Sequence, residues 1–367
     1  MKFACDRDAL LKEISVASEI ISSRNTLSIL SNVFLDARDN TVVLKATDLK
    51  VGFETRIPVE VSTPGRTTIF CDKLLGILRT VPEGDVEFEL KDNGLFVIRP
   101  RTRKVDFRLK SIDAEKFPEV HVAPDDQYFE VSQRDFIDMV GQTIFAVSDD
   151  ETRYFMNGVY MEQDQGELVM VATDGRRLSF VKKVPGNPVP EIPGVIIPPK
   201  VLTLVRKLAS GEGSFQLAVT DKNIFVKFEN RKVSSALIEG QFPNYRRVVP
   251  ESQQYEITVA KEDLLDALKR VSLLVEKSRR IYINLSENQM AIAGEESDIG
   301  AATEEVSCEY TGPENRIALN YLYLFEPLRV IDTDKVTLQY TEANKAITVY
   351  SSPRKEYFHI VMPMQLD

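Results

Sequence analysis

A segment near the middle of the chain, Thr173-Asp174-Gly175-Arg176-Arg177, brings together a carboxylate, a glycine and two guanidinium groups. Such groups could bind a phosphate or take part in a hydrolysis, for instance with Asp174 acting beside Arg177. A phosphate-binding loop, however, needs more glycine and a helix that begins directly after it, and neither is evident. The same residues are also typical of a turn at the end of a strand, so both interpretations stay open at this point.

The other residues that could do chemistry are few and scattered. Cys5, Cys71 and Cys308 lie far apart and have neither zinc nor disulfide spacing, which indicates reduced thiols in the cytoplasm. His121 and His359 stand alone. Because the sequence offers no nucleophile elbow, no base and no metal-ligand spacing, we expect a protein with no catalytic residues, no metal and no cofactor.

Composition places the chain among ordinary globular proteins. It has 367 residues, of which 43% are hydrophobic and 28% charged, and its length suggests two or three domains. No stretch approaches about 18 uncharged apolar residues, so we expect no membrane-spanning segment. Charged side chains in residues 1–13 interrupt the apolar core that a signal peptide needs. We therefore expect a cytoplasmic protein.

Charge is distributed unevenly along the chain. The formal net charge is −10, which speaks against binding nucleic acid by bulk attraction. Residues 1–122 nevertheless carry 19 basic and 19 acidic side chains, whereas residues 251–367 carry 12 basic and 20 acidic ones. Opposite charge at two ends of a chain often reflects contact between those ends, within or between molecules. The basic run is Arg99, Arg101, Arg103 and Lys104, and the acidic run is Glu295, Glu296, Asp298, Glu304 and Glu305.

The elements that must position these residues recur three times. Three segments are each predicted to form a strand that leads into an amphipathic helix, namely residues 3–11, 129–137 and 257–265. In the third of these helices, Leu264, Leu268 and Val271 have the spacing of one buried stripe. A second helix is predicted at 72–81, 199–208 and 320–330, and Pro327 is expected to kink or shorten the last one. A hairpin follows each second helix, at 86–98, 215–228 and 336–350.

These repeats predict the fold class. We expect an α+β protein of three domains, residues 1–122, 128–249 and 254–367, each with two helices packed on antiparallel sheets. The proline-rich stretch from Pro185 to Pro199 lies inside the second repeat and is predicted to be a long loop, not a linker. Hairpin sheets leave unpaired edges at the two chain ends. Pairing the basic end of one molecule with the acidic end of another would give either filaments or closed rings.

Several segments carry a resemblance that covers essentially the whole chain. They are Arg24–Asn32, Thr47–Leu49, Arg153–Gly158, Val171–Leu178, Phe242–Val248 and Val361–Leu366. In their order and spacing, together with the threefold repeat, the sequence resembles the bacterial DNA sliding clamps, the β subunits of the replicative DNA polymerase (DNA polymerase III). The resemblance implies a head-to-tail homodimer in which six repeats form a ring, with helices lining the hole and sheets forming the rim.

The resemblance also implies a function. Such a ring is a non-enzymatic processivity factor that encircles double-stranded DNA independently of sequence. Its implied partners are DNA, the polymerase catalytic subunit, the clamp loader, other proteins with a clamp-binding motif and a second copy of the chain, but no membrane. Two alternatives remain. One is an enzyme that uses Asp174 and Arg177. The other is a three-domain scaffold that binds proteins but not DNA, which predicts neither a ring nor a basic bias on the second helix.

The resemblance further implies a groove that receives partner peptides. Methionine and leucine surfaces suit aliphatic or aromatic anchors from several partners. The chain departs from familiar members of the family at Arg176, where histidine is common, at Gln365, where arginine is common, and at the extra Asp367. Asn344 and Ala346 are also more polar or smaller than expected, so peptide preference is open. The implied groove residues are Met156, Thr173, Gly175, Arg176, Arg177, Leu178, Pro243, Arg247, Val248, Asn344, Ala346, Ile360, Met362, Pro363 and Met364.

DNA contacts are expected in two places. A ring with net negative charge can enclose DNA if its helices carry positive charge inward, and the second helix of each repeat is basic. Each of these cations could equally belong to an ordinary solvated helix face. The resemblance adds Arg24, Arg153, Tyr154 and Phe155, although Asp150 weakens the case near Arg153. The helix residues are Lys73, Arg79, Lys200, Arg206 and Lys207, with Arg329 on the third helix.

The joint between two copies is expected at the chain's charged ends. Leu273 and Leu274 fit the apolar pair that the family places at its interface, although they could instead belong to a domain core. Phe107 is the corresponding candidate on the partner. The basic run at 99–104 and the acidic run at 295–305 would orient the two ends and steer their approach more than add affinity.

Overall fold

Each repeat has a strand that leads directly into an amphipathic helix. The chain is described by a computed structural model that covers residues 1–367 except 22–27, 188, 276, 295–297, 299 and 367. The Asp6 side chain caps the first helix by accepting a hydrogen bond from the Ala9 N–H at 2.9 Å. The Ser132 side chain does the same for Asp135 of the second repeat at 3.3 Å. The pairs are β1 (Lys2–Asp6) and α1 (Arg7–Ile20), β10 (Phe129–Ser132) and α3 (Gln133–Thr143), and β18 (Tyr255–Ala260) and α5 (Lys261–Val271).

The second helix of each repeat is also present where the sequence predicts it. These helices are α2 (Cys71–Thr80), α4 (Pro199–Leu208) and α6 (Tyr321–Val330). The expectation that Pro327 shortens α6 is wrong, because the helix continues to Val330 and has ten residues, as do α2 and α4. Proline removes one backbone hydrogen bond there. Burial of Leu324, Pro327 and Leu328 holds the helix despite that loss.

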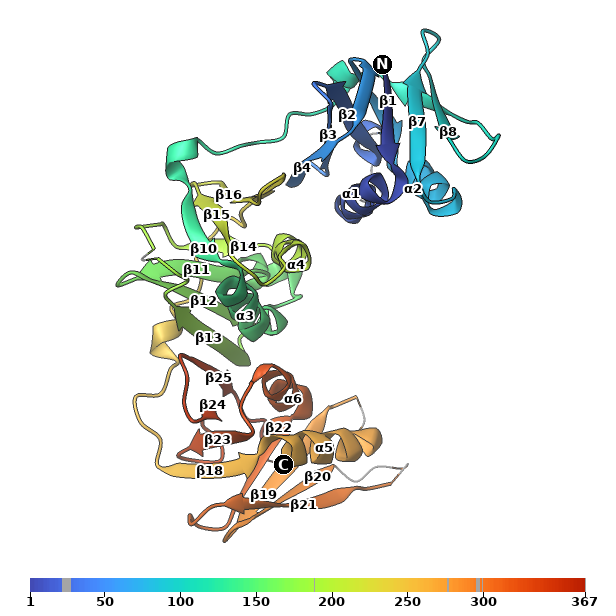
Figure 1. Ribbon diagram of the computed structural model, residues 1–367. Helices are drawn as coiled ribbons and strands as arrows, with labels where there is room; N and C mark the ends of the chain where they lie inside the picture. Colours follow the sequence, from blue (N-terminus) through green and yellow to red (C-terminus); the bar gives the residue numbers. More distant parts are fainter. Residues whose placement is uncertain (22–27, 188, 276, 295–297, 299, 367) are drawn as a thin grey trace. The chain divides into compact units, whose positions relative to one another are not determined.

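The chain divides into two compact units. Unit 1 contains Met1–Glu130 and Ser214–Leu237. In it α1 packs against α2, as seen at the blue end of the ribbon in Figure 1. Its core includes Phe3 and Phe88, whose rings stack 4.8 Å apart. The strands are β2 (Asn32–Arg38), β3 (Thr41–Thr47), β4 (Val51–Pro58), β5 (Glu60–Thr63), β6 (Gly65–Phe70), β7 (Asp85–Leu90), β8 (Leu95–Pro100), β9 (Phe107–Ile112), β15 (Ser214–Val219), β16 (Asn223–Lys227) and β17 (Arg231–Ala236), besides β1.

Unit 2 contains Val131–Gly213 and Ile238–Asp367. In it α5 packs against α6, and α3 packs against both α4 and the strand β13. The predicted hairpin of the third repeat is β23 with β24. The strands are β11 (Val159–Asp164), β12 (Glu167–Thr173), β13 (Arg177–Lys183), β14 (Val195–Ile197), β18, β19 (Arg280–Ser286), β20 (Gln289–Gly294), β21 (Thr303–Glu309), β22 (Asn315–Asn320), β23 (Lys335–Tyr340), β24 (Ile347–Ser352) and β25 (Tyr357–Val361).

Two continuous sheets join strands from neighbouring repeats. One runs β10-β15-β16-β17-β4-β3-β2-β6-β9-β8-β7-β1-β5, and the other runs β14-β11-β12-β13-β25-β24-β23-β18-β21-β20-β19-β22. Strand β17 of the second repeat pairs with β4 of the first, from Arg231 opposite Thr55 to Ser235 opposite Val51. Strand β13 of the second repeat pairs with β25 of the third in the same antiparallel way. The α+β class with antiparallel sheets is therefore confirmed.

The stretch from Pro185 to Pro199 is not all loop. Residues 195–197 form β14, which pairs with β11 from Val159 opposite Ile197 to Met161 opposite Val195. Val195, Ile196 and Ile197 are buried and all β-branched, a composition that suits a strand. The domain boundaries expected from the repeats stay a prediction.

Candidate functional sites

The turn between β12 and β13 is built from the segment Thr173–Arg177. The Asp174 Oδ1 atom accepts hydrogen bonds from the backbone N–H groups of Arg176 and Arg177, at 2.9 and 3.0 Å. The Thr173 Oγ1 atom accepts one from the Gly175 N–H at 3.1 Å. Gly175 has a φ of +87°, which a residue with a side chain rarely adopts. These are the bonds of a side-chain-stabilised turn, so the geometry favours the turn over a phosphate-binding loop.

Arg177 is bound by groups from several parts of unit 2. Its Nε donates to Asp174 at 3.0 Å, and a terminal nitrogen donates to the Phe145 carbonyl oxygen at 2.6 Å. Its other terminal nitrogen pairs with Glu326 of α6. The guanidinium also lies 4.8 Å from the centroid of the Tyr323 ring. Arg177 therefore joins β13 to α6, and its contact with a partner peptide stays a prediction.

An apolar cavity of about 140 Å³ opens beside this turn. Leu178 and Ile360, which face each other on the paired strands β13 and β25, are buried in its wall. Val248 and Met362 lie at its border and are 53% and 43% exposed. We call this space the first cavity. It is lined by Met156, Thr173, Gly175, Arg177, Leu178, Pro243, Asn244, Tyr245, Val248, Ile360 and Met362.

The wall that contains Tyr245 is held by the half-buried carboxylate of Glu162. Glu162 accepts hydrogen bonds from the hydroxyl groups of Tyr245 and Tyr160, at 2.7 and 3.0 Å, and from Arg246 at 2.7 Å. Tyr160 stacks on Phe242 with 4.8 Å between ring centroids. Burial, followed by the charge of Glu162, raises the pKa of Tyr160 to about 12. Both tyrosines therefore stay protonated at neutral pH and keep donating to Glu162, which fixes residues 242–246 against β11.

A second, more polar cavity of about 420 Å³ lies on the other side of Met362. Met362 borders both cavities. Its backbone N–H donates to the Arg176 carbonyl oxygen at 2.9 Å, and the Met364 N–H donates to the Ala318 carbonyl oxygen at 2.8 Å. The second cavity is lined by Arg176, Ser278, Arg280, Asn320, Tyr323, Met362, Pro363, Met364 and Gln365.

Most of the expected groove residues meet at these two cavities. Nine line the first cavity, and Arg176, Pro363 and Met364 line the second. Ala346 packs against the cluster that contains Leu178, whereas Arg247 and Asn344 are exposed and line neither cavity. The groove itself stays a prediction. Four lining residues that no motif spacing connects were not predicted, namely Ser278, Arg280, Asn320 and Tyr323.

His359 lies next to Ile360 on β25 and is buried. Its Nδ1 is 3.0 Å from the Ser179 hydroxyl oxygen, and 1% of the residue is exposed. Burial lowers the pKa of His359 from 6.5 to about 3. The folded chain therefore keeps this imidazole neutral at pH values where the unfolded chain protonates it.

We expect the stability of the protein to fall as the pH drops below 6.5. Above that pH the imidazole is neutral in both states, and between pH 6.5 and about 3 only the unfolded chain takes up the proton. Each pH unit in this window removes about 1.4 kcal/mol from the free energy of unfolding. Urea unfolding at pH 7.5 and 5.0 should show a loss about 2 kcal/mol larger for the wild type than for His359→Gln. The exposed His121→Gln serves as the control, and equal losses in all three proteins would refute this prediction.

The basic residues of the second helices lie on exposed faces. In α4 the buried side chains are Val201, Leu202, Leu204 and Val205, and Lys200, Arg206 and Lys207 are exposed. In α2 the buried side chains are Cys71, Leu74, Leu75 and Leu78, and Lys73 and Arg79 are exposed. The apolar face of each helix packs on its own unit, so the cations are accessible to a polyanion.

The segment 153–155 lies in a short 3-10 helix, Glu151–Met156, beside the turn at Gly175. A Cβ atom on Gly175 would lie 2.8 Å from a terminal nitrogen of Arg153, so this guanidinium covers the turn. Tyr154 is 53% exposed, but Phe155 is half-buried and packs against the cluster around Leu178. Arg153 also pairs with Asp150 at 2.9 Å. Arg24 lies outside the described residues, and DNA contact by the others stays a prediction.

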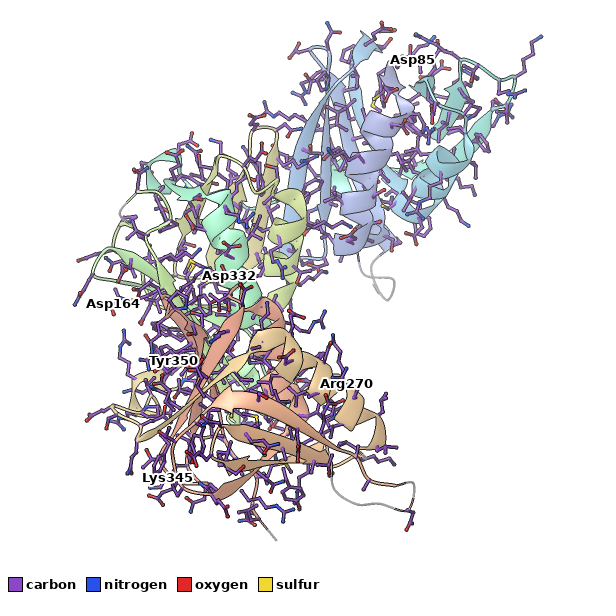
Figure 2. The ribbon with its side chains drawn as sticks, turned by 60° about the horizontal axis from the view of Figure 1, so that its bottom comes forward. Asp85, Asp164, Arg270, Asp332, Lys345 and Tyr350 are labelled. Carbon is purple, nitrogen blue, oxygen red and sulfur yellow. The ribbon has the colours of Figure 1, made fainter. Side chains whose placement is uncertain are left out.

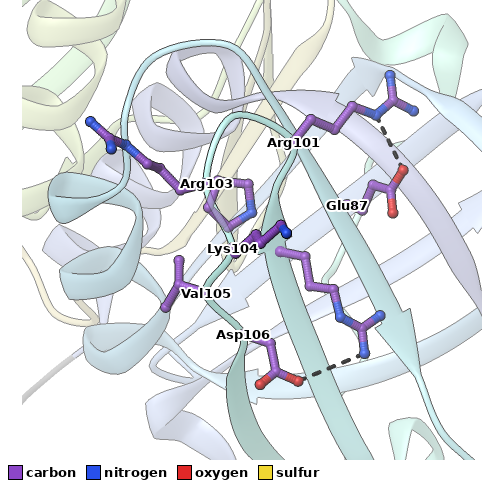
Figure 3. A pocket seen from close by; sticks show the side chains of 8 residues that line it. Glu87, Arg101, Arg103, Lys104, Val105 and Asp106 are labelled. Atoms are coloured by element: carbon purple, nitrogen blue, oxygen red, sulfur yellow. Dashed lines mark hydrogen bonds and ion pairs between the residues drawn. The ribbon is translucent and has the colours of Figure 1, made fainter.

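The basic run at 99–104 is partly neutralised within unit 1. Figure 3 shows Arg101 directed at Glu87. Arg103 and Lys104 are exposed and, in the part of the chain that the structure describes, form no ion pair. In Figure 3 Arg103 extends away from Glu87 and Asp106. Arg101 pairs with Glu60, Asp85 and Glu87 at 3.3, 2.9 and 3.2 Å, and Arg99 pairs with Glu89 at 3.0 Å.

The acidic run is partly neutralised too. Arg270, labelled on α5 in Figure 2, binds both carboxylate oxygens of Glu304 at 2.6 and 2.8 Å. Gln289 donates to Glu305 at 2.6 Å, and Asp298 is exposed. Glu295 and Glu296 lie outside the described residues. Fewer unpaired charges are therefore available to steer the approach of two copies than the sequence suggests.

Apolar groups are exposed beside the acidic run. Leu273 is 79% exposed, and Leu274 is half-buried in the 3-10 helix Ser272–Leu274 that follows α5. Leu273 is therefore not a core residue of its repeat. Phe107, at the start of β9, is half-buried. No residue in the described ranges belongs to a helix long and apolar enough to cross a membrane.

Comparison with known proteins covers the whole chain. Three domain families match in succession, described as the N-terminal, central and C-terminal domains of the DNA polymerase III beta subunit, at residues 1–121, 130–244 and 246–365. The beta sliding clamp of Treponema pallidum is 42% identical over 372 residues, which is 100% of both chains. Crystal structures of sliding clamps from Pseudomonas aeruginosa and Bartonella birtlesii, each bound to griselimycin, match with TM-scores of 0.94 at 29% and 27% identity over 100% of both chains.

Proposed function

The chain belongs to the family of DNA polymerase III beta subunits, the beta sliding clamps, and from this we propose that it encircles duplex DNA as a ring-shaped homodimer. The match of all three domain families along the full length is the observation that carries the proposal. In this role the protein is a processivity factor and performs no catalysis itself. It holds the replicative polymerase on its template.

The exposed cations of α2 and α4 support contact with DNA phosphates. Lys73 and Arg79 project from one helix, and Lys200, Arg206 and Lys207 from another, each opposite a buried apolar face. These side chains offer attraction without base recognition, since contacts to phosphates carry no sequence information. Arg153 and the exposed ring of Tyr154 would add a contact to single-stranded template, where aromatic rings stack on bases.

The two cavities support a groove for partner peptides. The first cavity has apolar walls from Leu178, Ile360 and Val248, which suit an aliphatic or aromatic anchor. The second cavity is more polar and would hold the rest of a short, extended peptide. So small a contact predicts weak, exchangeable binding. Polymerase, clamp loader and other clamp-binding proteins would therefore take turns at the same site.

We expect stable association with DNA to be topological. A free protein with a net charge of −10 neutralises few phosphates at once, so it should bind a short linear duplex weakly. After loader-driven assembly on a nicked circular plasmid, the protein should stay bound in moderate salt and leave when the plasmid is cut once. Gel filtration of labelled protein with DNA measures the retained fraction.

Blocking the ends of the linear DNA provides the control for this experiment. Bulky protein blocks at both ends should restore retention, because the ring then cannot slide off. Loss from the uncut circle, or tight binding to the short linear duplex, would contradict encirclement. Binding to partner proteins without any loading onto circular DNA would instead favour the three-domain scaffold.

A further inference from the structure

The sulfur atoms of this chain are distributed unevenly between its interior and its surface. All three cysteines are buried, and burial raises the pKa of the Cys5 and Cys71 thiols to about 12. Thiolates, which react with peroxides, are therefore scarce at neutral pH. Five of the eight methionines are buried as well, namely Met139, Met156, Met161, Met170 and Met290.

The accessible thioethers lie at the groove, apart from the N-terminal Met1. Met362 is 43% exposed and Met364 is half-buried. Met362 borders both cavities, and Met364 lines the second. The backbone N–H of Met362 donates a hydrogen bond to the Arg176 carbonyl oxygen, and that of Met364 donates one to the Ala318 carbonyl oxygen. Apart from Met1, the sulfur atoms that a small diffusible oxidant meets first therefore lie at the surface where a partner peptide is proposed to dock.

We propose that Met362, with Met364 beside it, is a site of reversible oxidation that switches off partner binding. The inference rests on the proposed function of the groove. Hydrogen peroxide is the oxidant. The thioether sulfur attacks one peroxide oxygen, and the S–O bond forms as the O–O bond breaks. The other oxygen takes up the proton of the attacked oxygen and leaves as water. The sulfur loses two electrons to give methionine sulfoxide, and the peroxide is reduced.

The sulfoxide changes the groove in two ways. A polarizable apolar thioether that suits aliphatic and aromatic anchors becomes a strongly polar group. Burying that S=O group against an anchor side chain would leave it without a hydrogen-bond donor, which is unfavourable. Because Met362 borders both cavities, one oxidised atom would disturb the anchor site and the neighbouring polar site together. Peptide affinity should fall about tenfold or more.

The experiment compares reduced and peroxide-treated full-length protein. The probe is a fluorescent peptide chosen by titrating short overlapping peptides of the cognate polymerase catalytic subunit against reduced protein. Mass spectrometry of proteolytic fragments should find sulfoxide at Met362 and Met364 before the buried methionines. Fluorescence anisotropy should show weaker binding after oxidation, and methionine sulfoxide reductases A and B should restore it. An unchanged melting curve shows that the loss is not unfolding.

Two variants make the outcome decisive. In Met362→Leu/Met364→Leu the ratio of affinities before and after peroxide should be close to one, whatever the starting affinity. The buried Met290→Leu should respond as the wild type does. An equal loss in the Met362/Met364 variant, or full affinity of wild type carrying sulfoxide at Met362, would overturn the switch. If the reduced protein binds none of the peptides, the groove proposal fails and the switch is rejected with it.

Discussion

Replacing both Leu273 and Leu274 with alanine is expected to convert the protein from a dimer to a monomer. Leu273 is 79% exposed in the 3-10 helix that follows α5 in the third repeat, and the half-buried Leu274 is its neighbour in the chain. In the proposed head-to-tail ring Leu273 packs against the first repeat of the partner. Losing a buried leucine costs about 2 kcal/mol or more, so two at each of the two joints of the closed ring remove roughly 8 kcal/mol. The dissociation constant for separation into monomers would rise about a millionfold.

Sedimentation equilibrium from nanomolar to micromolar concentration measures this change. Leu49→Ala is the matched control, because Leu49 is also largely exposed, at 57%, but lies outside the proposed joint. Circular dichroism and melting should show that the double variant keeps its fold. A wild-type chain that sediments as a monomer at micromolar concentration would count against the ring, as would a double variant that stays dimeric.

Removing residues 362–367 is expected to abolish peptide binding and to leave the dimer intact. Strand β25 ends at Val361, and the residues after it supply Met362 to both cavities and Met364 to the second. The buried floor, with Leu178 and Ile360, remains. Since the side chains of residues 362–366 are exposed or half-buried, the melting temperature should change little. Isothermal titration calorimetry with the polymerase-derived peptide, run beside a melting curve, measures both quantities.

Smaller changes at the same site provide the controls. Removing 365–367 alone keeps Met362 and Met364 and should preserve most of the binding. Leu178→Ala or Met364→Ala should weaken binding by about 1–3 kcal/mol, the range usual for one buried anchor contact. Unchanged peptide affinity after the full truncation would refute the groove. A sharp drop in melting temperature would show instead that Met362–Met364 fills the core of the third repeat.

The repeated elements could be predicted because their signals are local. Leu264, Leu268 and Val271 lie one helical turn apart, and all three are buried on α5. Asn93-Gly94 predicts the tight turn of the first hairpin, where Gly94 has a φ of +76°. Strand β14 was missed because three residues among prolines carry little local signal. That strand depends on pairing with β11, which no short window reveals.

The candidate site was predicted only through resemblance, since its contacts join residues that are distant in sequence. Tyr245 and Glu162 are 83 positions apart, and Arg177 and Glu326 are 149 apart. No periodicity encodes such pairs, and each of these residues taken alone suits an ordinary surface. For the charged runs, the sequence instead suggests more unpaired charge than the folded chain has. Arg101 and Glu304 suggest free charges in the sequence, but the folded chain has already paired them with their own neighbours.

The sheets that continue from one repeat into the next make the connecting segments dispensable once the chain has folded. Residues 124–127 and 246–248 are exposed, which is where proteases cut folded proteins. A cut there would break the polypeptide, but the fragments would stay associated. Strand β17 would still pair with β4, and β13 with β25, through backbone hydrogen bonds. A nicked protein should therefore migrate as intact under native conditions and as fragments in denaturant. In a closed dimer, the joint between copies, and not these connecting segments, would then be the place where the ring opens.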